Sequence, residues 1–446
     1  MRKIFKKVFN PESLPKILFI LSLCVLSFAY GYLSLAGGLF PHGLITEAVA
    51  FFIDDEKGLP WYYIKTEATT KIPIYEKDSA YNGLSLMTSI AEDRLLAASV
   101  INMNGELIHR WDLDWFEIWP EVTHIPKTDH QYPHTRPGTF LQGAVLLENG
   151  DLIYNYTYLG LVRVDVCGNV IWRLPYRTHH SVYLDEYGIL WVPGQIKHEE
   201  AVPDLPYHVP DFYEFTVLKV SLDGEILEEF FVFDILKKND LHGLIGLLSN
   251  GNRIVSVTGD TLHLNDVETF PSSLEEGVFK AGDIMLSLRN INTILIFREE
   301  DLKVTHVSTG TYVRQHDPDF IDGDTISVFD NYNIGPEEYG HQSRIVIESF
   351  DEDQHYTYFY GTEEQPFYTD VQGNHQWLPN GNLLITESRK ARAFEIDTEG
   401  NIVWEYINLV EDEKAGIIDN MQRIPKLFTE EYFNQLVRSC DVDITD

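Results

Sequence analysis

The stretch WLPNGNLLITESRKARAFEIDTEGNIVWEY (377–406) contains two hairpins in succession. Asn380-Gly381 separates two apolar strands, and Glu399-Gly400 separates two more. Asn-Gly supplies the positive φ angles that a tight hairpin turn requires, and short apolar runs on both sides of a turn are typical of paired strands. The stretch therefore predicts one antiparallel sheet of four strands.

Both hairpin types recur along the chain. The first type is a short apolar strand, a turn containing Gly and a second apolar strand, and it occurs at 146–156, 183–192, 320–329 and 377–386. The second type ends in an aromatic or aliphatic residue after its Gly turn, and it occurs at 100–111, 162–172, 218–227 and 394–404. One hairpin of each type makes a four-stranded blade, with blades beginning near Gly83, Gln142, His180, His263, His316 and His375. Such repeats predict an all-β fold, a six-bladed β-propeller, with an open β-sandwich array as the alternative.

A long apolar run near the N-terminus, Ile17 to Phe40, follows the basic residues Arg2, Lys3, Lys6, Lys7 and Lys16. About 20 apolar residues cross a bilayer as a helix, and flanking basic residues mark the cytoplasmic side. The sequence thus predicts a single-pass membrane protein with its propeller on the extracytoplasmic (periplasmic) side. The alternative is a cleaved signal peptide ending at Ser34-Leu35-Ala36, which would also export the rest of the chain.

These features predict four parts. Residues 1–40 form a basic flank and a transmembrane helix, 41–80 a linker or small cap, 81–410 the propeller, and 411–446 an acidic C-terminal tail with some helical character. The chain has three cysteines, and Cys24 lies in the apolar run. A Cys167–Cys440 disulfide cannot be argued from the sequence alone.

The charge balance is strongly acidic, with 69 Asp and Glu against 34 Lys and Arg. A surface of this kind repels phosphate backbones, so we expect no nucleic acid partner. It also repels anionic lipid. Membrane attachment is therefore expected to depend on the hydrophobic helix.

Histidines stand directly before the first hairpin of several blades, namely His180, His263, His316 and His375. From His180, His316 and His375 to the hairpin glycine the intervals are eight, seven and six residues. Equivalent positions on different blades converge around the propeller axis, so we expect these side chains to form one cluster in the channel mouth. The simpler alternative is that each histidine is a hydrogen-bonded core residue. No compact spacing of Asp, Glu and His suggests a metal site, and we expect none.

Four segments resemble the arylsulfotransferase family of bacterial propellers, and their order and spacing agree over roughly residues 80–410. They are DTLHLNDVE (260–268), IMLSLRNINTILIF (284–297), RQHDPDFIDGDTISVFDN (314–331) and GNHQWLPNGNLLITESRKARAFEIDTEGNIVWEY (373–406). The resemblance implies transfer of a sulfuryl group from a phenolic sulfate donor to a phenolic acceptor. It also implies a sulfohistidine intermediate and independence of PAPS, so we expect no cofactor.

The resemblance also implies site residues. The histidine of the "QHD" motif, the family's nucleophile, falls on His316, and the arginine of the "S-x-R" strand falls on Arg289. The "H-x-N" motif gives His263, a candidate acid for the leaving phenolate, and Asn265. The earlier channel histidine is His180, with His179 beside it. We therefore predict two groups: catalytic His316, His263, Arg289 and His180, and substrate-binding Asn265, His179 and His375.

Three features depart from the family. VTHVSTG (304–310) stands where many members carry a tryptophan, Asn290 follows Arg289 where some have histidine, and the domain ahead of the propeller is reduced to 41–80. That domain helps other members to dimerise, so the oligomeric state stays open. Two other functions also stay open. One is a non-catalytic propeller that binds a ligand or partner, and the other is a different propeller enzyme, such as a lyase or a metal-dependent hydrolase.

Overall fold

Residues 14–37, 59–249, 251, 253–335 and 340–440 are described by the computed structural model. The chain forms two units, Met1–Tyr62 and Tyr63–Asp446. The first contains helix α2 (Leu14–Gly37), whose apolar part Leu14–Tyr32 is long enough to cross a membrane. The predicted apolar N-terminal helix is thereby confirmed. Both a membrane span and a signal sequence have this length and composition.

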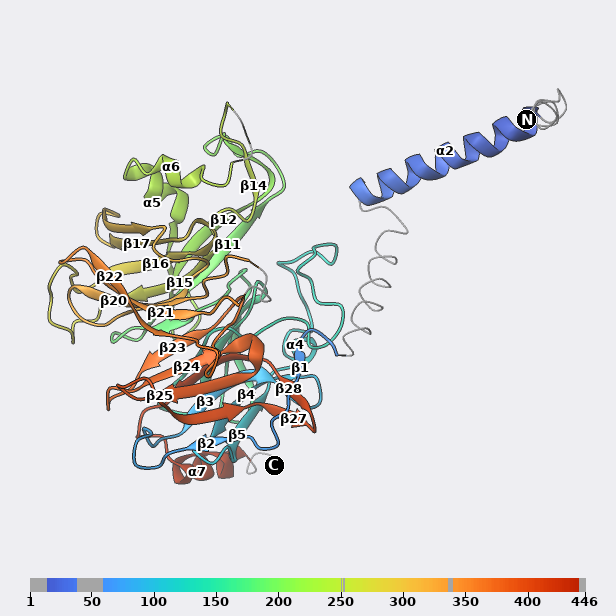
Figure 1. The fold of residues 1–446 in the computed structure, drawn as a ribbon. Coiled ribbons are helices and arrows are strands. Elements are labelled where there is room, and N and C mark those ends of the chain that lie inside the picture. Colours follow the sequence, from blue (N-terminus) through green and yellow to red (C-terminus); the bar gives the residue numbers. More distant parts are fainter. Residues whose placement is uncertain (1–13, 38–58, 250, 252, 336–339, 441–446) are drawn as a thin grey trace, which may run out of the picture. The chain divides into compact units, whose positions relative to one another are not determined.

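The second unit is mostly β, as predicted. Six of its sheets are built on four antiparallel strands, to which two of the sheets add a fifth strand, and we number these sheets in chain order (Figure 1). Sheet 1 consists of β29 (Ile418–Arg423), β3 (Ser85–Ile90), β4 (Leu96–Ile101) and β5 (Leu107–Asp112). Sheet 2 consists of β6 (Ala144–Leu146), β7 (Leu152–Tyr156), β8 (Gly160–Val164) and β9 (Val170–Leu174). Sheet 3 consists of β10 (Tyr183–Leu184), β11 (Ile189–His198), β12 (His208–Ser221) and β13 (Ile226–Phe231), with β14 (Val257–Gly259) parallel to β12.

The remaining three large sheets follow the same order. Sheet 4 consists of β15 (Leu264–Thr269), β16 (Asp283–Leu288), β17 (Thr293–Arg298) and β18 (Val304–Thr309). Sheet 5 consists of β19 (His316–Phe320), β20 (Thr325–Asp330), β21 (Arg344–Ser349) and β22 (Gln354–Tyr360). Sheet 6 consists of β23 (Asn374–Trp377), β24 (Leu383–Glu387), β25 (Arg392–Ile396) and β26 (Ile402–Ile407). Gly381, in the β23–β24 turn, has a φ of +88°, as the Asn-Gly turn requires.

Apolar side chains fill the space between consecutive sheets. Separate buried clusters join sheets 2 and 3, 3 and 4, 4 and 5, 5 and 6, and 6 and 1. Between sheets 1 and 2, Trp111 donates from Nε1 to the carbonyl oxygen of Asp165, and Gln422 donates to that of Ala144. Each sheet therefore packs on the next, which buries the middle strands, whereas outer strands such as β9 and β22 stay partly exposed.

The two ends of the second unit contribute strands to sheets formed by the other end. β29 pairs with β3 of sheet 1, and β2 (Ile74–Tyr75) pairs with β26 of sheet 6. A small sheet combines β1 (Tyr63–Lys65), β28 (Lys414–Gly416) and β27 (Leu409–Glu411). Strands thus occur both in the segment expected to be a linker or cap and in the one expected to be an acidic tail.

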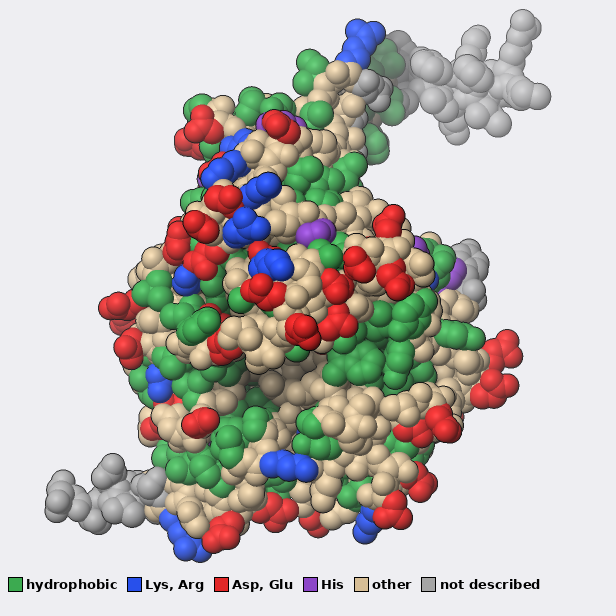
Figure 2. Space-filling view, turned by 90° about the vertical axis from the view of Figure 1, so that its left-hand side faces the viewer, with side chains coloured by type: hydrophobic (Ala, Val, Ile, Leu, Met, Phe, Trp, Pro, Cys, Tyr) green, Lys and Arg blue, Asp and Glu red, His purple; other side chains and the backbone are tan. Residues whose placement is uncertain are grey.

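Two insertions interrupt the repeat. One, between sheets 1 and 2, contains α4 (Trp115–Ile118). The other lies in and after sheet 3, and it contains the extended part of the β11–β12 hairpin and the short helices α5 (Val232–Lys238) and α6 (His242–Ile245). The face in Figure 2 is hollowed near its centre, and acidic side chains are spread widely over it.

A disulfide joins Cys167, in the β8–β9 turn of sheet 2, to Cys440, at the end of α7 (Glu430–Cys440). The two Cα atoms are 5.6 Å apart, and 273 residues separate the cysteines in sequence. On α7, Phe433 is buried and its ring stacks on His109 of β5. The disulfide therefore fastens a helix that covers sheet 1 to the neighbouring sheet 2.

Replacing Cys167 and Cys440 by Ala should lower the free energy of unfolding by about 2–5 kcal/mol, because the cross-link restricts the unfolded chain over a long loop. Urea denaturation of the full chain in detergent measures the loss. Cys24→Ala is the control, since Cys24 is an exposed free cysteine on α2. Equal stabilities of the double variant and this control would contradict the expectation.

Candidate active site

Histidines precede or begin the first strands of three neighbouring sheets. His180 lies shortly before β10, His263 directly precedes β15, and His316 begins β19. His180 and His263 share a left-handed backbone, with φ angles of 58° and 54°. Non-glycine residues adopt this conformation rarely, so its repetition at equivalent places marks a specific bend. The bend turns both side chains toward one another.

These histidines meet in one buried cluster. Nε2 of His263 lies 3.3 Å from Nε2 of His180, and Nδ1 of His180 lies 2.9 Å from Nδ1 of His179. The ring centroids of His180 and His316 are 6.1 Å apart. Asp260 contacts Nδ1 of His263 from the other side. Four of the predicted site residues, from three sheets, are thus brought together.

Asn331 fixes the tautomer of His316. Its Nδ2 donates to the carbonyl oxygens of Thr369 (3.0 Å) and Gln372 (2.8 Å), so its Oδ1 must face His316. That oxygen lies 2.6 Å from Nδ1 of His316 and can only accept, which places the ring proton on Nδ1. Nε2 of His316 keeps its lone pair, and it is buried without a hydrogen-bond partner among the residues that the structure describes. Sequence reasoning missed Asn331, although pairing of His316 with Phe329 in the hairpin would have placed it close by.

Two arginines approach the histidines. Arg289 donates from Nε and Nη2 to Oδ1 of Asn290 at 3.3 and 3.2 Å, and Arg314 donates to the same oxygen. In the part of the chain that the structure describes, neither guanidinium has a carboxylate within ion-pair distance. Burial lowers the pKa of Arg289, and the negative charge of Asp260, which lies farther away, opposes this shift in part. Arg314 was not predicted, and Asn290, a departure from the family pattern, is the residue that holds both side chains.

Burial keeps the histidine cluster uncharged. It lowers the pKa of His316 to about 3, with a further contribution from Arg289. It also lowers the pKa of His179 to about 3, helped by His263. The pKa of His180 falls well below its ordinary value for the same reason, and that of His263 is lowered by burial despite the opposing charge of Asp260. At neutral pH the rings are therefore neutral imidazoles, the nucleophilic form.

The cluster opens into a polar channel. A cavity of about 50 Å³ is lined by His180, His316, Asn265 and polar residues of neighbouring sheets. A larger cavity of about 390 Å³ shares Asp266, Asp317, Asn374 and Asn420 with it. Residues from the first strands of all six sheets line this larger cavity. Asn265 donates from Nδ2 to the carbonyl oxygen of Gln315, while its own buried Oδ1 has no partner.

His375 lies apart from the other predicted histidines, on β23. Its Nδ1 is 3.0 Å from Oδ2 of Asp317, and its Nε2 is 2.8 Å from Oγ of Ser327. Ligand atoms of Asp317, Asp319 and His375 lie within 4.8 Å of one another, a spacing that a metal ion would also accept. A substrate-binding role for His375 stays a prediction.

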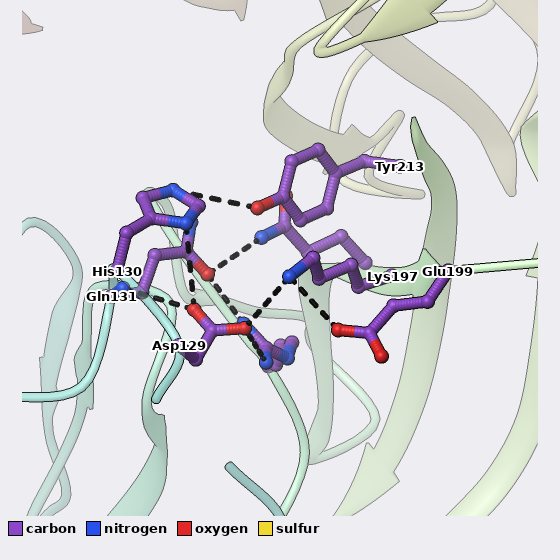
Figure 3. A network of polar contacts seen from close by, with 8 residues as sticks. Asp129, His130, Gln131, Lys197, Glu199 and Tyr213 are labelled. Atoms are coloured by element: carbon purple, nitrogen blue, oxygen red, sulfur yellow. Dashed lines mark hydrogen bonds and ion pairs between the residues drawn. The ribbon is translucent and has the colours of Figure 1, made fainter. Parts of the chain in front are cut away.

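A second polar network joins residues 129–131 to Arg177, which lies two residues before His179, and to the β11–β12 hairpin (Figure 3). Asp129 accepts from Arg177 at 2.8 Å and from Lys197 at 3.3 Å, and Tyr213 lies 3.5 Å from Nε2 of His130. Burial alone would raise the pKa of Asp129, but Arg177, the backbone N–H of Gln131 and Lys197 hold it at about 2. Asp129, Arg177 and Lys197 line a cavity of about 760 Å³. The network ties the first insertion to the β11–β12 hairpin.

The fold and the site define a class: a mostly β, propeller-like protein with neutral histidines gathered beside two arginines that Asn290 holds. The chain matches the model of the family described as Arylsulfotransferase (ASST) over residues 143–409, more than half of its length. The chain belongs to this family, as the resemblance of its motifs predicted. No curated protein sequence matches the chain.

Solved structures with a similar arrangement have little sequence in common with this chain. A protein of unknown function from Bacteroides caccae is 11% identical, with 76% of this chain and 98% of that chain covered and a TM-score of 0.46. A catalytically inactive virginiamycin B lyase from Staphylococcus aureus is 9% identical, with coverages of 78% and 89% and a TM-score of 0.38. The WD40 β-propeller domain of Doa1 is 10% identical, with coverages of 77% and 87% and a TM-score of 0.40.

Replacing Arg289 by Met should abolish most activity yet leave the free energy of unfolding nearly unchanged, since no ion pair is lost. Arg423→Met is the matched control, because Arg423 is buried and lies 2.9 Å from Glu395. Breaking that pair should cost about 3–5 kcal/mol. Urea denaturation and turnover of an aryl sulfate, measured on both variants, test the contrast. A large destabilisation in Arg289→Met would show that this arginine is structural.

The buried histidines should make the protein less stable in acid. In the folded protein the pKa of His316 and that of His179 are lowered to about 3, whereas a histidine of the unfolded chain has a pKa near 6.5. The contribution of each ring to the free energy of unfolding is therefore complete above pH 6.5, and it is lost as the pH falls toward 3. Between pH 7.5 and 5 each such histidine costs about 2 kcal/mol. His316→Gln should reduce the acid loss by about that amount in urea denaturation. His355→Gln, at an exposed position, should behave like the unmodified protein, and equal losses in all three would contradict the prediction.

Proposed function

We propose that this chain is a PAPS-independent aryl-sulfate sulfotransferase that works through a sulfohistidine on His316. The observation that carries the proposal is the state of Nε2 of His316, which is buried, unpartnered and fixed as the lone-pair nitrogen by Asn331. A neutral imidazole nitrogen with a free lone pair is a good nucleophile near pH 7. Family membership supports a sulfotransferase-like activity.

The scaffold that we propose is a six-bladed β-propeller. Three observations support it: the six sheets built on four antiparallel strands, the packing of each sheet on the next, and the cavity lined by the first strands of all six. The pairing of β29 with β3 would then close the ring, by completing the first blade with a strand from the C-terminal end. In such a ring, residues at the starts of the first strands converge.

The first half-reaction would transfer the sulfuryl group to the protein. Nε2 of His316 attacks sulfur, an N–S bond forms, and the bond between sulfur and the phenolic oxygen breaks. The leaving phenolate takes a proton that enters from solvent through His263, which is transiently protonated beside Asp260 and then returns to its neutral form. The negative sulfuryl oxygens would bind Arg289 and Arg314, two guanidiniums near the histidine cluster that have no carboxylate within ion-pair distance among the described residues.

The second half-reaction would reverse these steps with a new phenol. The oxygen of the acceptor attacks sulfur, the N–S bond breaks, and His316 returns to its neutral form. The proton of the acceptor passes to His263 and from there to solvent, which returns the histidine cluster to its neutral starting state. The substrates would also contact His180 and Asn265, which line the small cavity, and His179, which adjoins His180.

We place the enzyme outside the cytoplasm, held by α2 in the membrane. Two features support this location: the long apolar helix near the N-terminus and the Cys167–Cys440 disulfide, since disulfides persist in oxidising compartments.

Incubation with a nitrophenyl sulfate should add one sulfuryl group to the protein, visible in its intact mass, and peptide mapping should place it on His316. His316→Ala should abolish both the added mass and the transfer. His263→Ala should slow transfer about 10²–10⁴-fold, the usual contribution of acid catalysis. His355→Ala, at an exposed histidine, is the control. A protein that binds the ester but never gains mass would be a binding module instead.

A further inference from the structure

We propose that Asp317 and His375 form a positioning pair that holds His316 in its reactive orientation; the inference rests on the proposed role of His316. Through this pair, one segment, Thr369–His375, would support the nucleophile from two sides. The segment leads into β23 of sheet 6, whereas His316 belongs to sheet 5.

The backbone beside His316 has an uncommon shape. Asp317 is left-handed, with a φ of 48°, and the pairing of β19 with β20 shifts register between His316 and Pro318. A bulge of this kind redirects the side chains around it, and a left-handed non-glycine residue persists only where its surroundings hold it. The orientation of His316 therefore depends on what fixes Asp317.

His375 supplies that fixation. Its backbone N–H donates to Oδ2 of Asp317 at 2.5 Å, and its Nδ1 lies 3.0 Å from the same oxygen. Oγ of Ser327 accepts from Nε1 of Trp377, so its own hydrogen can point to Nε2 of His375. Nδ1 of His375 then carries a proton and donates it to Asp317, while Nε2 also lies 3.5 Å from Oδ2 of Asp319. Burial lowers the pKa of His375, but Asp319 and Asp317 together raise it above its ordinary value. The side chain of His375 is fully buried, which favours one fixed geometry.

The same segment also holds His316 through Asn331. The carbonyl oxygens of Thr369 and Gln372 orient the Asn331 amide, which in turn accepts from Nδ1 of His316. Between these contacts, Gly373 passes so close to Phe329 that a Cβ there would lie 2.5 Å from its ring. Phe329 is the strand partner of His316. Segment 369–375 is thus packed against the hairpin that carries the nucleophile.

The pair can be tested with two substitutions at Asp317 in the full-length protein. Asp317→Ala removes the acceptor of both bonds, whereas Asp317→Asn keeps an oxygen that can accept them. We expect Asp317→Ala to slow single-turnover sulfation of His316 about 10- to 100-fold, with little change in the half-saturating donor concentration, because orientation and not binding is lost. Asp317→Asn should restore most of the rate. Asp397→Ala is the matched control, since Asp397 also accepts backbone N–H groups, but in the β25–β26 turn.

A second readout does not depend on activity. In protein labelled with ¹⁵N-histidine, the His316 signal, identified by its absence in His316→Gln, should report the Nδ1–H tautomer. It should become a mixture of tautomers in Asp317→Ala and stay unchanged in Asp317→Asn and Asp397→Ala. If the unmodified protein is never sulfated, the proposed function fails, while this signal still decides whether Asp317 positions His316.

Several outcomes would overturn the pair. The proposal fails if Asp317→Ala is sulfated as fast as the Asp397→Ala control and the ¹⁵N signal of His316 is unchanged. If Asp317→Ala does not fold, His375→Leu carries the test, since it keeps the backbone bond and removes the ring donor; an unchanged rate and signal would refute the proposal. Loss of sulfation in EDTA, restored by Mn²⁺, would mean that Asp317, Asp319 and His375 bind a cation instead.

Discussion

The antiparallel pairing of β29 with β3 is the interaction on which the rest of the structure depends. It joins residues 338 positions apart, with Arg423 opposite Ser85. Because consecutive sheets pack on one another, the order of the chain is also the order of the sheets in space. The first strands then face a shared channel, and residues far apart in sequence become neighbours there. The histidine cluster is a consequence of this arrangement.

The chemistry of the centre follows from burial. Water is kept from His179, His180, His263 and His316, so their charged forms are disfavoured and the rings stay neutral. The arginines cannot lose their charge in the same way, and Arg289 and Arg314 form no ion pair with a carboxylate of the described residues, although the charge of Asp260 acts on Arg289 from farther away. A site with neutral bases and positively charged groups outside ion pairs favours an anion that a lone pair can attack. A sulfate ester is such an anion, because it carries a negative charge and its sulfur can be attacked by a lone pair.

Much of this arrangement could be predicted from the sequence, because it rests on local signals. Turn residues and apolar strands predicted the hairpins. The cluster was predicted because histidines recur before these hairpins, at His180, His263 and His316. The sequence analysis missed the roles of Asn331 and Arg314, because only the hairpin register and the packing of sheets bring them to the site. It also expected His375 in the cluster, whereas the ring of His375 contacts Asp317 instead. The disulfide and β29 join distant parts of the chain, for which no local pattern exists.

The position of β29 near the C-terminus has a consequence for biogenesis. During synthesis, β3 emerges early and presents a strand edge without its partner until β29 has followed. Exposed edges are templates for aggregation, so a chain cut short before Ile418 would expose the edge of sheet 1. The pairing of β29 with β3 thus protects an edge that is open for most of the time in which the chain is made.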